Sequence, residues 1–264
     1  MRRRIITALV TGTATVLLAG CGPLAGGAGG DTPTAVTTTA LASPREKLAA
    51  AVPDGSAGRY AFSFKDAQST TKGVVEPKAK RVSMTTSYKE PELGFTLTMS
   101  YLVVEADQWV KISFDKKIAG LPQLPKKWLR VDPAKIEDNP FDGAEDPDPI
   151  AAGMLFDAIV DVKESEPGTY AGTLDLTKAP EAQIVDEDGL KALGAKAKGV
   201  AFTATLDDAG RLSVLDIKVP AYAQVKAFTH HATYGDYGSA AQVEAPAASA
   251  SQDAPDEAYE LLNS

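Results

Sequence analysis

FTLTMSYLV, residues 95–103, decides the fold class, because every second side chain in it is apolar. Phe95, Leu97, Met99, Tyr101 and Val103 fall on one side of an extended chain, since successive side chains of a strand point to opposite faces. This period of two predicts a long strand with one buried face.

The same period occurs on both sides of this stretch. Before it, residues 58–66 and 82–88 alternate in the same way, and after it residues 110–114 do so beyond a short turn at 105–108. Consecutive strands joined by short turns form an antiparallel meander. A further short extended piece is expected at 128–131.

The second half of the chain returns to strands after a middle section rich in Pro, Gly and acidic residues. Strands are expected at 169–176, 200–206, 211–219 and 226–237, with a tight turn at 207–210 supplied by Asp and Gly. The total is about eight antiparallel strands. So wide a sheet has to curl, because strands twist and exposed edges need protection.

Short helices are expected to cover one face of this sheet. Ser43 is a suitable N-cap for a helix over 43–51, with Pro44 at its first position and Pro53 beyond its end. Residues 150–160 have helical spacing of apolar side chains, and 188–197 predict another short helix. The fold class is therefore α+β, a curved antiparallel half-barrel over a few short helices.

Residues 1–21 are typical of an export signal. Three arginines precede an apolar run over 5–18, which is shorter than the ~18 residues that span a bilayer. Leu18-Ala19-Gly20-Cys21 resembles the lipobox of bacterial lipoproteins, and this resemblance implies cleavage before Cys21 and a diacylglyceryl anchor on its thiol. The protein would then be exported and held by lipid on the outer face of the cytoplasmic membrane. The alternative is an ordinary exported protein with a chance thiol.

The composition along the chain indicates where the domains begin and end, and the net charge limits the classes of partner. Residues 1–20 read as the signal peptide, 21–50 as lipidated Cys and flexible tether, 51–245 as the half-barrel domain and 246–264 as a disordered tail. Loss of the three signal arginines changes the formal net charge from −8 to −11. A chain this acidic is a poor ligand for nucleic acid or anionic headgroups. We expect a monomer.

The motifs of common enzymes do not occur in the sequence. No nucleophile elbow, dinucleotide turn, phosphate loop or zinc-binding His-Glu-x-x-His helix is present. His230 and His231 adjoin on an expected strand and so point to opposite faces. The acidic loop from Asp138 to Asp148 places proline where an EF-hand requires carboxylates. The sequence predicts a non-enzyme without cofactor or metal.

Several segments together resemble the actinobacterial LppX/LprG-type lipoproteins and, more broadly, the LolA/LolB-like half-barrels. The matching segments are the lipobox, ADQWVKI (106–112), KWLRVD (127–132), GTLDL (172–176), VAFTATLD (200–207), GRL (210–212) leading to IKVPA (217–221), and YGDYG (234–238). The resemblance implies a curved sheet over helices with an apolar cavity that in relatives holds acyl chains of glycolipids or triacyl lipids.

Strand phase alone selects the candidate residues for lining such a cavity or packing the core. They are Phe62, Phe64, Phe95, Leu97, Met99, Val110, Ile112, Met154, Leu155, Phe202 and Ile217. The first hypothesis is a membrane-anchored carrier of an acylated lipid or glycolipid. The alternative is a structural or regulatory interaction module whose sheet is packed solid and holds no ligand.

Overall fold

The computed structural model describes residues 42–91, 93–117, 124–137 and 146–263. The described residues belong to one compact unit. The predicted signal, the lipobox with Cys21, and the tether up to residue 41 lie outside them.

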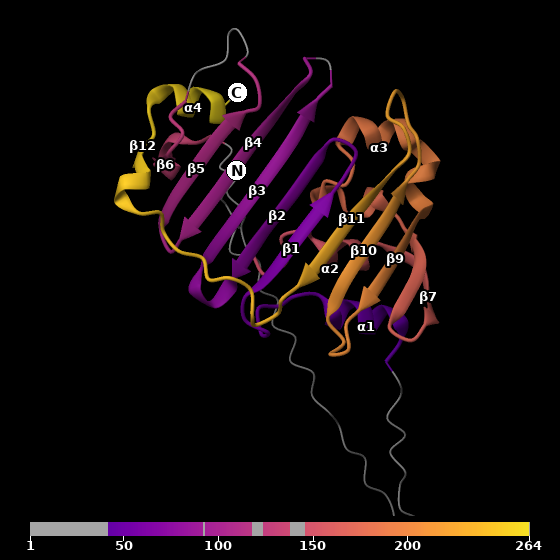
Figure 1. Cartoon of the computed structure of the whole chain (residues 1–264). Coiled ribbons are helices and arrows are strands. Elements are labelled where there is room, and N and C mark those ends of the chain that lie inside the picture. Colours follow the sequence, from indigo (N-terminus) through magenta and orange to yellow (C-terminus); the bar gives the residue numbers. More distant parts are fainter. Residues whose placement is uncertain (1–41, 92, 118–123, 138–145, 264) are drawn as a thin grey trace, which may run out of the picture. The chain divides into compact units, whose positions relative to one another are not determined.

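The described chain forms one open, curved sheet of twelve strands in the order β12-β6-β5-β4-β3-β2-β1-β11-β10-β9-β8-β7 (Figure 1). The strands are β1 (Tyr60–Lys65), β2 (Ser69–Glu76), β3 (Arg81–Glu90), β4 (Phe95–Val104), β5 (Asp107–Phe114), β6 (Trp128–Val131), β7 (Ile159–Glu166), β8 (Thr169–Leu174), β9 (Val200–Leu206), β10 (Leu212–Val219), β11 (Phe228–Gly235) and β12 (Ser251–Asp253). The class is α+β, as predicted. The prediction of about eight strands was wrong.

The three additional strands lack a regular alternation of apolar and polar residues. β2 (STTKGVVE) places its apolar residues together at one end, and β7 (IVDVKESE) is exposed along most of its length. β12 has three residues and pairs with β6 in parallel, so the sheet is mixed where an antiparallel one was predicted. Pairing with neighbouring strands, not local sequence, decides such segments.

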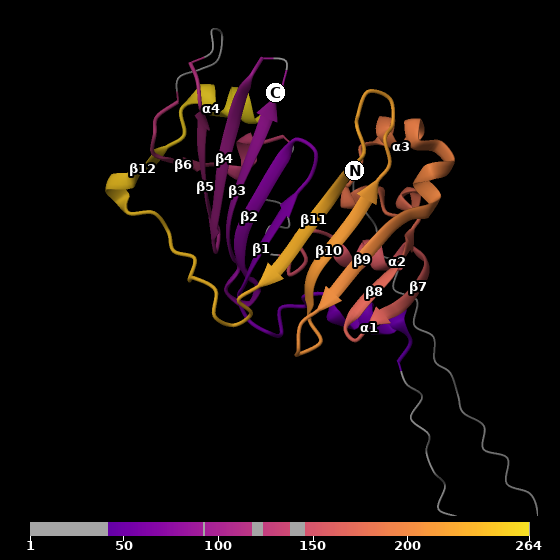
Figure 2. The ribbon, with the colours of Figure 1, turned by 45° about the vertical axis from the view of Figure 1, so that its right-hand side comes forward.

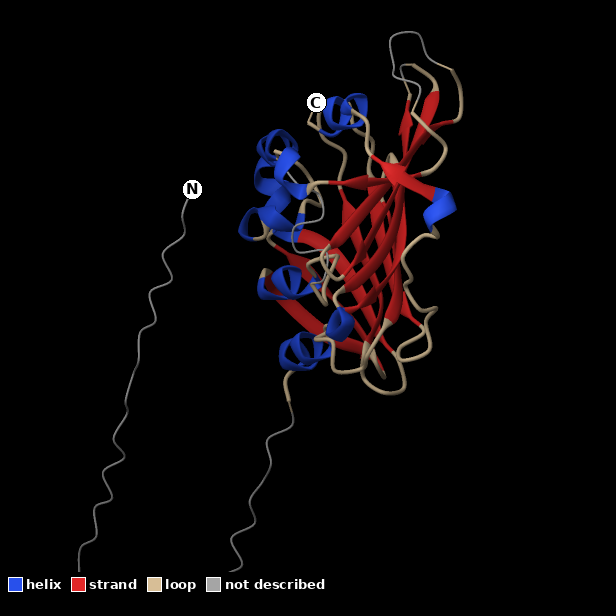
Figure 3. Cartoon of the chain, turned by 90° about the vertical axis from the view of Figure 1, so that its left-hand side faces the viewer, coloured by secondary structure: helices blue, strands red, loops and turns tan. Residues whose placement is uncertain are grey.

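All four α-helices lie on one face of the sheet, here called the inner face (Figure 3). They are α1 (Pro44–Ala51), α2 (Ala152–Asp157), α3 (Glu187–Leu193) and α4 (Asp256–Leu262). Short 3-10 helices are η1 (Pro77–Ala79), η2 (Pro133–Lys135), η3 (Leu176–Lys178), η4 (Pro180–Ala182), η5 (Gly194–Gly199) and η6 (Ala248–Ala250). The helix predicted over 150–160 ends earlier, because Ile159 begins β7.

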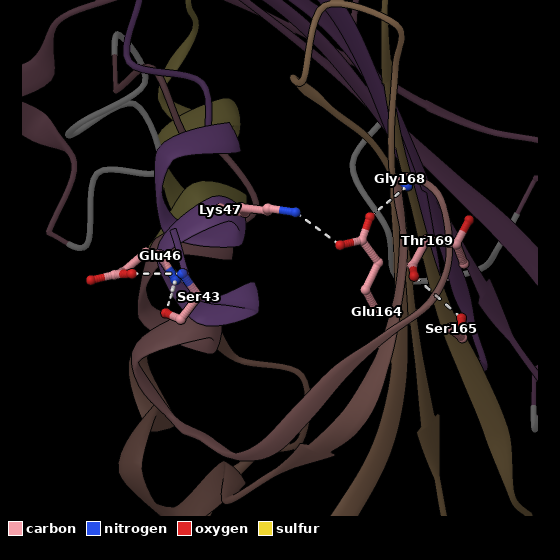
Figure 4. Close-up of polar contacts among 7 residues, drawn as sticks. All are labelled: Ser43, Glu46, Lys47, Glu164, Ser165, Gly168 and Thr169. Atoms are coloured by element: carbon pink, nitrogen blue, oxygen red, sulfur yellow. Dashed lines mark hydrogen bonds and ion pairs between the residues drawn. The ribbon is translucent and has the colours of Figure 1, made fainter. Parts of the chain in front are cut away.

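Helix α1 begins as the sequence predicted and is fixed to the edge of the sheet (Figure 4). Ser43 is its N-cap in a reciprocal capping box with Glu46, and Pro44 is its first residue. Lys47 Nζ lies 2.8 Å from Glu164 Oε2 on β7. Arg45 donates to the carbonyl of Ile159 at the start of the same strand. The helix therefore belongs to the folded domain, where the prediction had placed it in the tether.

The segment after β11 contains secondary structure within residues 246–263, a range predicted as part of a disordered tail. It runs over the outer face of the sheet, opposite the helices, and then supplies β12 and α4 (Figure 2). The backbone N–H of Val243 donates to buried Glu76 Oε1 at 2.6 Å. Asp132 N–H donates to the Tyr259 hydroxyl at 2.8 Å, which fixes α4 beside β6.

The core has two parts, one on each face. The large cluster lies between the inner face and the helices. A smaller one on the outer face contains Leu102, Trp109 and Val243, with Val74, Val104 and Trp128 packed against it. The crossing segment thus gives the outer face an apolar cover of its own, which explains both tryptophans as packing residues.

Candidate functional site

Strand register assembles the inner face into rows of side chains that come from distant parts of the chain. One row runs Phe62, Gly73, Met84, Tyr101 and Val110 across β1 to β5. The next runs Phe64, Thr71, Thr86, Met99 and Ile112. The alternation seen in the sequence therefore produces one continuous surface, as the predicted strand phases require.

The predicted lining residues fall into three groups on this surface. Six of them are at most 4% exposed and belong to the main core: Phe62, Val110, Ile112, Leu155, Phe202 and Ile217. Four are partly buried: Phe64, Phe95, Leu97 and Met99. Met154 on α2 is 49% exposed, so it does not line the inner core.

The half of the inner face formed by β7 to β11 is closed by helices. Leu155 and Phe156 of α2 are buried against it, and the Phe156 ring lies 6.3 Å from that of Phe202 on β9. Ala197 of η5 and Leu193 of α3 are also buried. These helices cover most of this half, while Val162, Leu206 and Phe228 on its strands stay partly buried.

The other half is less completely covered. Phe64, Met84, Leu97, Met99 and Phe114, on β1, β3, β4 and β5, pack against the core but stay partly exposed. We call these five residues the inner apolar strip. The Phe114 ring makes an edge contact with Phe95, with centroids 5.7 Å apart.

A groove of about 330 Å³ lies at one end of this sheet. It is lined by residues 66–69 of the β1–β2 turn, Tyr88 of β3, residues 184–186 before α3, and Tyr222, Val225 and Phe228. We call it the rim groove. The β1–β2 turn and α3 lie at the end of the sheet opposite α1 (Figure 1).

The rim groove adjoins the inner apolar strip. Tyr88 of the groove is paired in register with Leu97 of the strip. On the other side, His230 follows Phe228 by two positions on β11, and its ring stacks on Phe64 with centroids 5.6 Å apart. The strand register and this ring stack thus place the inner apolar strip directly beside the rim groove.

His230 is the buried polar residue at this junction. It is 5% exposed, and its Nε2 has no hydrogen-bond partner among the residues that the structure describes. Burial lowers the pKa of its imidazole below the ordinary value, so the ring is neutral near pH 7. His231 is exposed and its Nδ1 lies 2.6 Å from Asp216 Oδ1. The two histidines therefore point to opposite faces of the sheet, as predicted.

A second polar cluster lies elsewhere on the inner face and is satisfied internally. Asp148 accepts from Gly153 N–H at 2.8 Å and from the Tyr234 hydroxyl at 3.2 Å, while the Tyr60 hydroxyl donates to the Pro147 carbonyl. Burial raises the pKa of the Asp148 carboxyl. These bonds fix the start of α2 against β1 and β11, which is a structural role.

The remaining sequence predictions concern metals and the membrane. Asp138, Asp142 and Glu145 of the acidic loop lie outside the described residues, while Asp146 and Asp148 lie inside them. Within the described ranges, no group of three or more His, Cys, Asp or Glu side chains is placed to hold a metal ion. None of the helices in the same ranges has the length and apolarity needed to cross a membrane.

Sequence reasoning did not find the rim groove. Its residues come from four segments that lie far apart in the chain, and none of them carries a motif. His230 was noted, but its free nitrogen depends on its neighbours in the fold. Comparison with protein-family models and with curated proteins gives no match for this chain.

Proposed function

We propose that this protein is a membrane-anchored extracytoplasmic lipoprotein that binds an acylated lipid on the inner face of its sheet. The observation that carries the proposal is the partly exposed inner apolar strip and its continuation into the rim groove. Large apolar side chains that stay open to solvent in a contiguous patch commonly mark a binding surface.

The sequence supports the location. The lipobox resemblance at Leu18 to Cys21 implies an acylated Cys21, and two acyl chains are enough for stable membrane attachment. The likeness to LppX/LprG-type lipoproteins adds a carrier role for acyl chains. Chemistry on the ligand is not part of the proposal, which is for a binding protein and not an enzyme.

The direct test is native mass spectrometry, with solvent extraction, of the domain from residue 42 onward, purified from an actinobacterial host. We expect co-purifying lipid of defined mass. Leu97→Trp and Met99→Trp should block uptake because an indole fills the strip. Thr98→Trp is the matched control, because residue 98 lies on the opposite face and pairs with Ser87. Unchanged lipid content in folded Leu97→Trp protein would contradict the proposal.

The anchor is tested separately. Cys21→Ser should move the protein from the membrane fraction to the soluble exported fraction. Membrane retention of this variant, at the level of the unmodified protein, would exclude lipidation of Cys21 as the anchor.

One observation favours the alternative, an interaction module without a ligand. Six of the eleven predicted lining residues are already buried in the core. That reading predicts a protein that stays free of lipid when acyl lipids are offered, together with a protein partner that remains bound after delipidation.

A further inference from the structure

The charges of the rim groove point to the class of lipid it accepts. Asp66 lies in the β1–β2 turn and Asp186 is the N-cap of α3, and both line the groove. Among the described residues, no Lys, Arg or His side chain lines it. Over the described ranges, neither aspartate forms an ion pair. Within the described part of the chain, no cation therefore neutralises these two negative charges.

The carboxylates also bear on the interior of the groove. Tyr222 lines the groove, and the pKa of its hydroxyl is raised by burial and by the charges of Asp186 and Asp66. An anionic group entering the groove would meet the same two charges. Asp66 accepts hydrogen bonds from the N–H groups of Gln68 and Ser69 and from the Ser69 hydroxyl, and Asp186 accepts one from the Gly189 N–H. A carboxylate has about four acceptor sites, so a ligand hydroxyl group would still find acceptors there.

His230 does not line the rim groove, but it lies beside the inner apolar strip, and its Nε2 is buried without a hydrogen-bond partner among the described residues. Its ring stacks on Phe64 of the inner apolar strip, and Asp66 is near enough to act on its charge. Neutral imidazole can donate to an ester carbonyl or accept from a hydroxyl. A partner of this kind would satisfy a group that otherwise stays buried without one.

We propose that the preferred ligand is an uncharged acyl ester with free hydroxyl groups, and that anionic phospholipids are rejected at the rim groove. This inference rests on the proposed function. The acyl chains lie along the inner apolar strip, the ester group lies near His230, and the hydroxyl groups reach Asp66 and Asp186. A phosphate has no cation to neutralise it there, so entry places like charges together at a cost.

The experiment compares two lipids with identical chains, dimyristoylglycerol and dimyristoyl phosphatidic acid, for binding to the domain at physiological salt. We expect the glycerol lipid to bind at least about 10-fold more tightly, which corresponds to ~1.4 kcal/mol. Equal binding of both, or tighter binding of the phosphatidic acid, would overturn the inference and leave the carrier function standing. If neither lipid binds, the proposed function fails with it.

Substitutions in the rim groove test whether Asp66 and Asp186 cause the preference for the uncharged lipid. Asp66→Asn with Asp186→Asn should reduce the preference to about 2-fold, since asparagine keeps both the turn and the helix cap. Asp188→Asn is the matched control for a lost charge, because Asp188 is exposed on α3 outside the groove. An unchanged preference in the folded double variant would contradict the role of the two carboxylates.

His230 is tested with a ligand that has no ester. His230→Phe keeps an aromatic stack on Phe64 and should weaken dimyristoylglycerol about 5-fold, the effect of about one hydrogen bond. Binding of hexadecane should stay the same. Equal weakening of both ligands, or no weakening of either, would contradict the contact.

Discussion

At the scale of single residues, Gly73 decides how closely β2 packs under the aromatic side chain of β1. Gly73 is paired with Phe62, and a Cβ at this position would lie 2.4 Å from the Ser83 carbonyl oxygen and 2.7 Å from the Phe62 ring. The oxygen belongs to the backbone of the neighbouring strand, so it cannot move aside. The glycine is required for close approach and not for an unusual backbone angle.

We therefore predict that Gly73→Ala lowers the free energy of unfolding by about 1–3 kcal/mol through overpacking. Gly199→Ala is the control, because a Cβ at this position would meet open space, with no described atom within 4 Å apart from its chain neighbours and its own helix backbone. Urea unfolding of both variants measures the difference in the free energy of unfolding, provided that its slope against urea concentration is the same for both. Equal midpoints for the two variants would show that β2 shifts without cost.

His230 gives the domain a pH dependence that can be assigned to one side chain. Its pKa is lowered first by burial, with a further lowering from His231 and opposing effects of Asp66 and Asp216. The unfolded chain therefore binds more protons than the folded one just below the ordinary pKa of 6.5. Stability is present above that pH and is lost as the pH falls through it.

We predict that His230→Phe makes the free energy of unfolding less dependent on pH from about pH 6.5 downward. Its stability at pH 7 should not fall, because an unpartnered buried nitrogen is replaced by carbon. Urea melts at a series of pH values measure this, with His231→Gln as the control that keeps the buried ring. An unchanged pH profile in His230→Phe would assign the titration to other groups.

At the scale of elements, the C-terminal segment completes the sheet at the β6 edge. Leu129 and Val131 of β6 and the nearby Ile136 are buried. Ala258 of α4 is fully buried in the same core, and Leu261 and Leu262 pack against it. The Ala-, Pro- and Ser-rich composition of this segment predicts disorder. Its contacts with β6 and with the core cannot be recognised from the segment's own residues.

We predict that deletion of residues 248–264 lowers the free energy of unfolding by about 2–5 kcal/mol, because it uncovers the apolar side chains of β6. Ala258→Glu should have a similar effect by placing a charge in the core. Glu260→Ala, exposed on the same helix, should change stability by less than about 0.5 kcal/mol. Thermal and urea unfolding measure the stabilities of the three variants. A truncated domain as stable as the full one would refute the prediction.

At the scale of the whole molecule, an open sheet must protect its two edges. One edge is the three-residue β12, and the other is β7. β7 is mostly exposed, charged and interrupted by two irregularities in its pairing with β8. Short edges, charges and bulges all hinder pairing with a second copy. The predicted monomer depends on these features.

We predict that Lys163→Val with Glu166→Val causes self-association through β7. The matched control is Lys191→Val with Glu187→Val on exposed α3, which removes the same pair of charges away from an edge. Light scattering coupled to size exclusion gives the molar masses. A monomeric β7 variant would show that the charges are not needed.

The sequence by itself determined the features that depend on neighbouring residues. The alternation in 95–103 defines β4 and its buried face, and Ser43 with Pro44 defines the start of α1. The adjacency of His230 and His231 fixes their opposite directions. In each of these, the physical cause acts over a few residues, so the local pattern contains it.

Tertiary structure alone decided which part of the inner face is filled and which stays open. Met99 and Ile112 share one row and the same apolar character, yet Ile112 is buried and Met99 is partly exposed. The difference depends on what other segments place above each residue. The rim groove, the free nitrogen of His230 and the strands β2, β7 and β12 likewise arise from contacts between segments far apart in the chain, and no local pattern records such contacts.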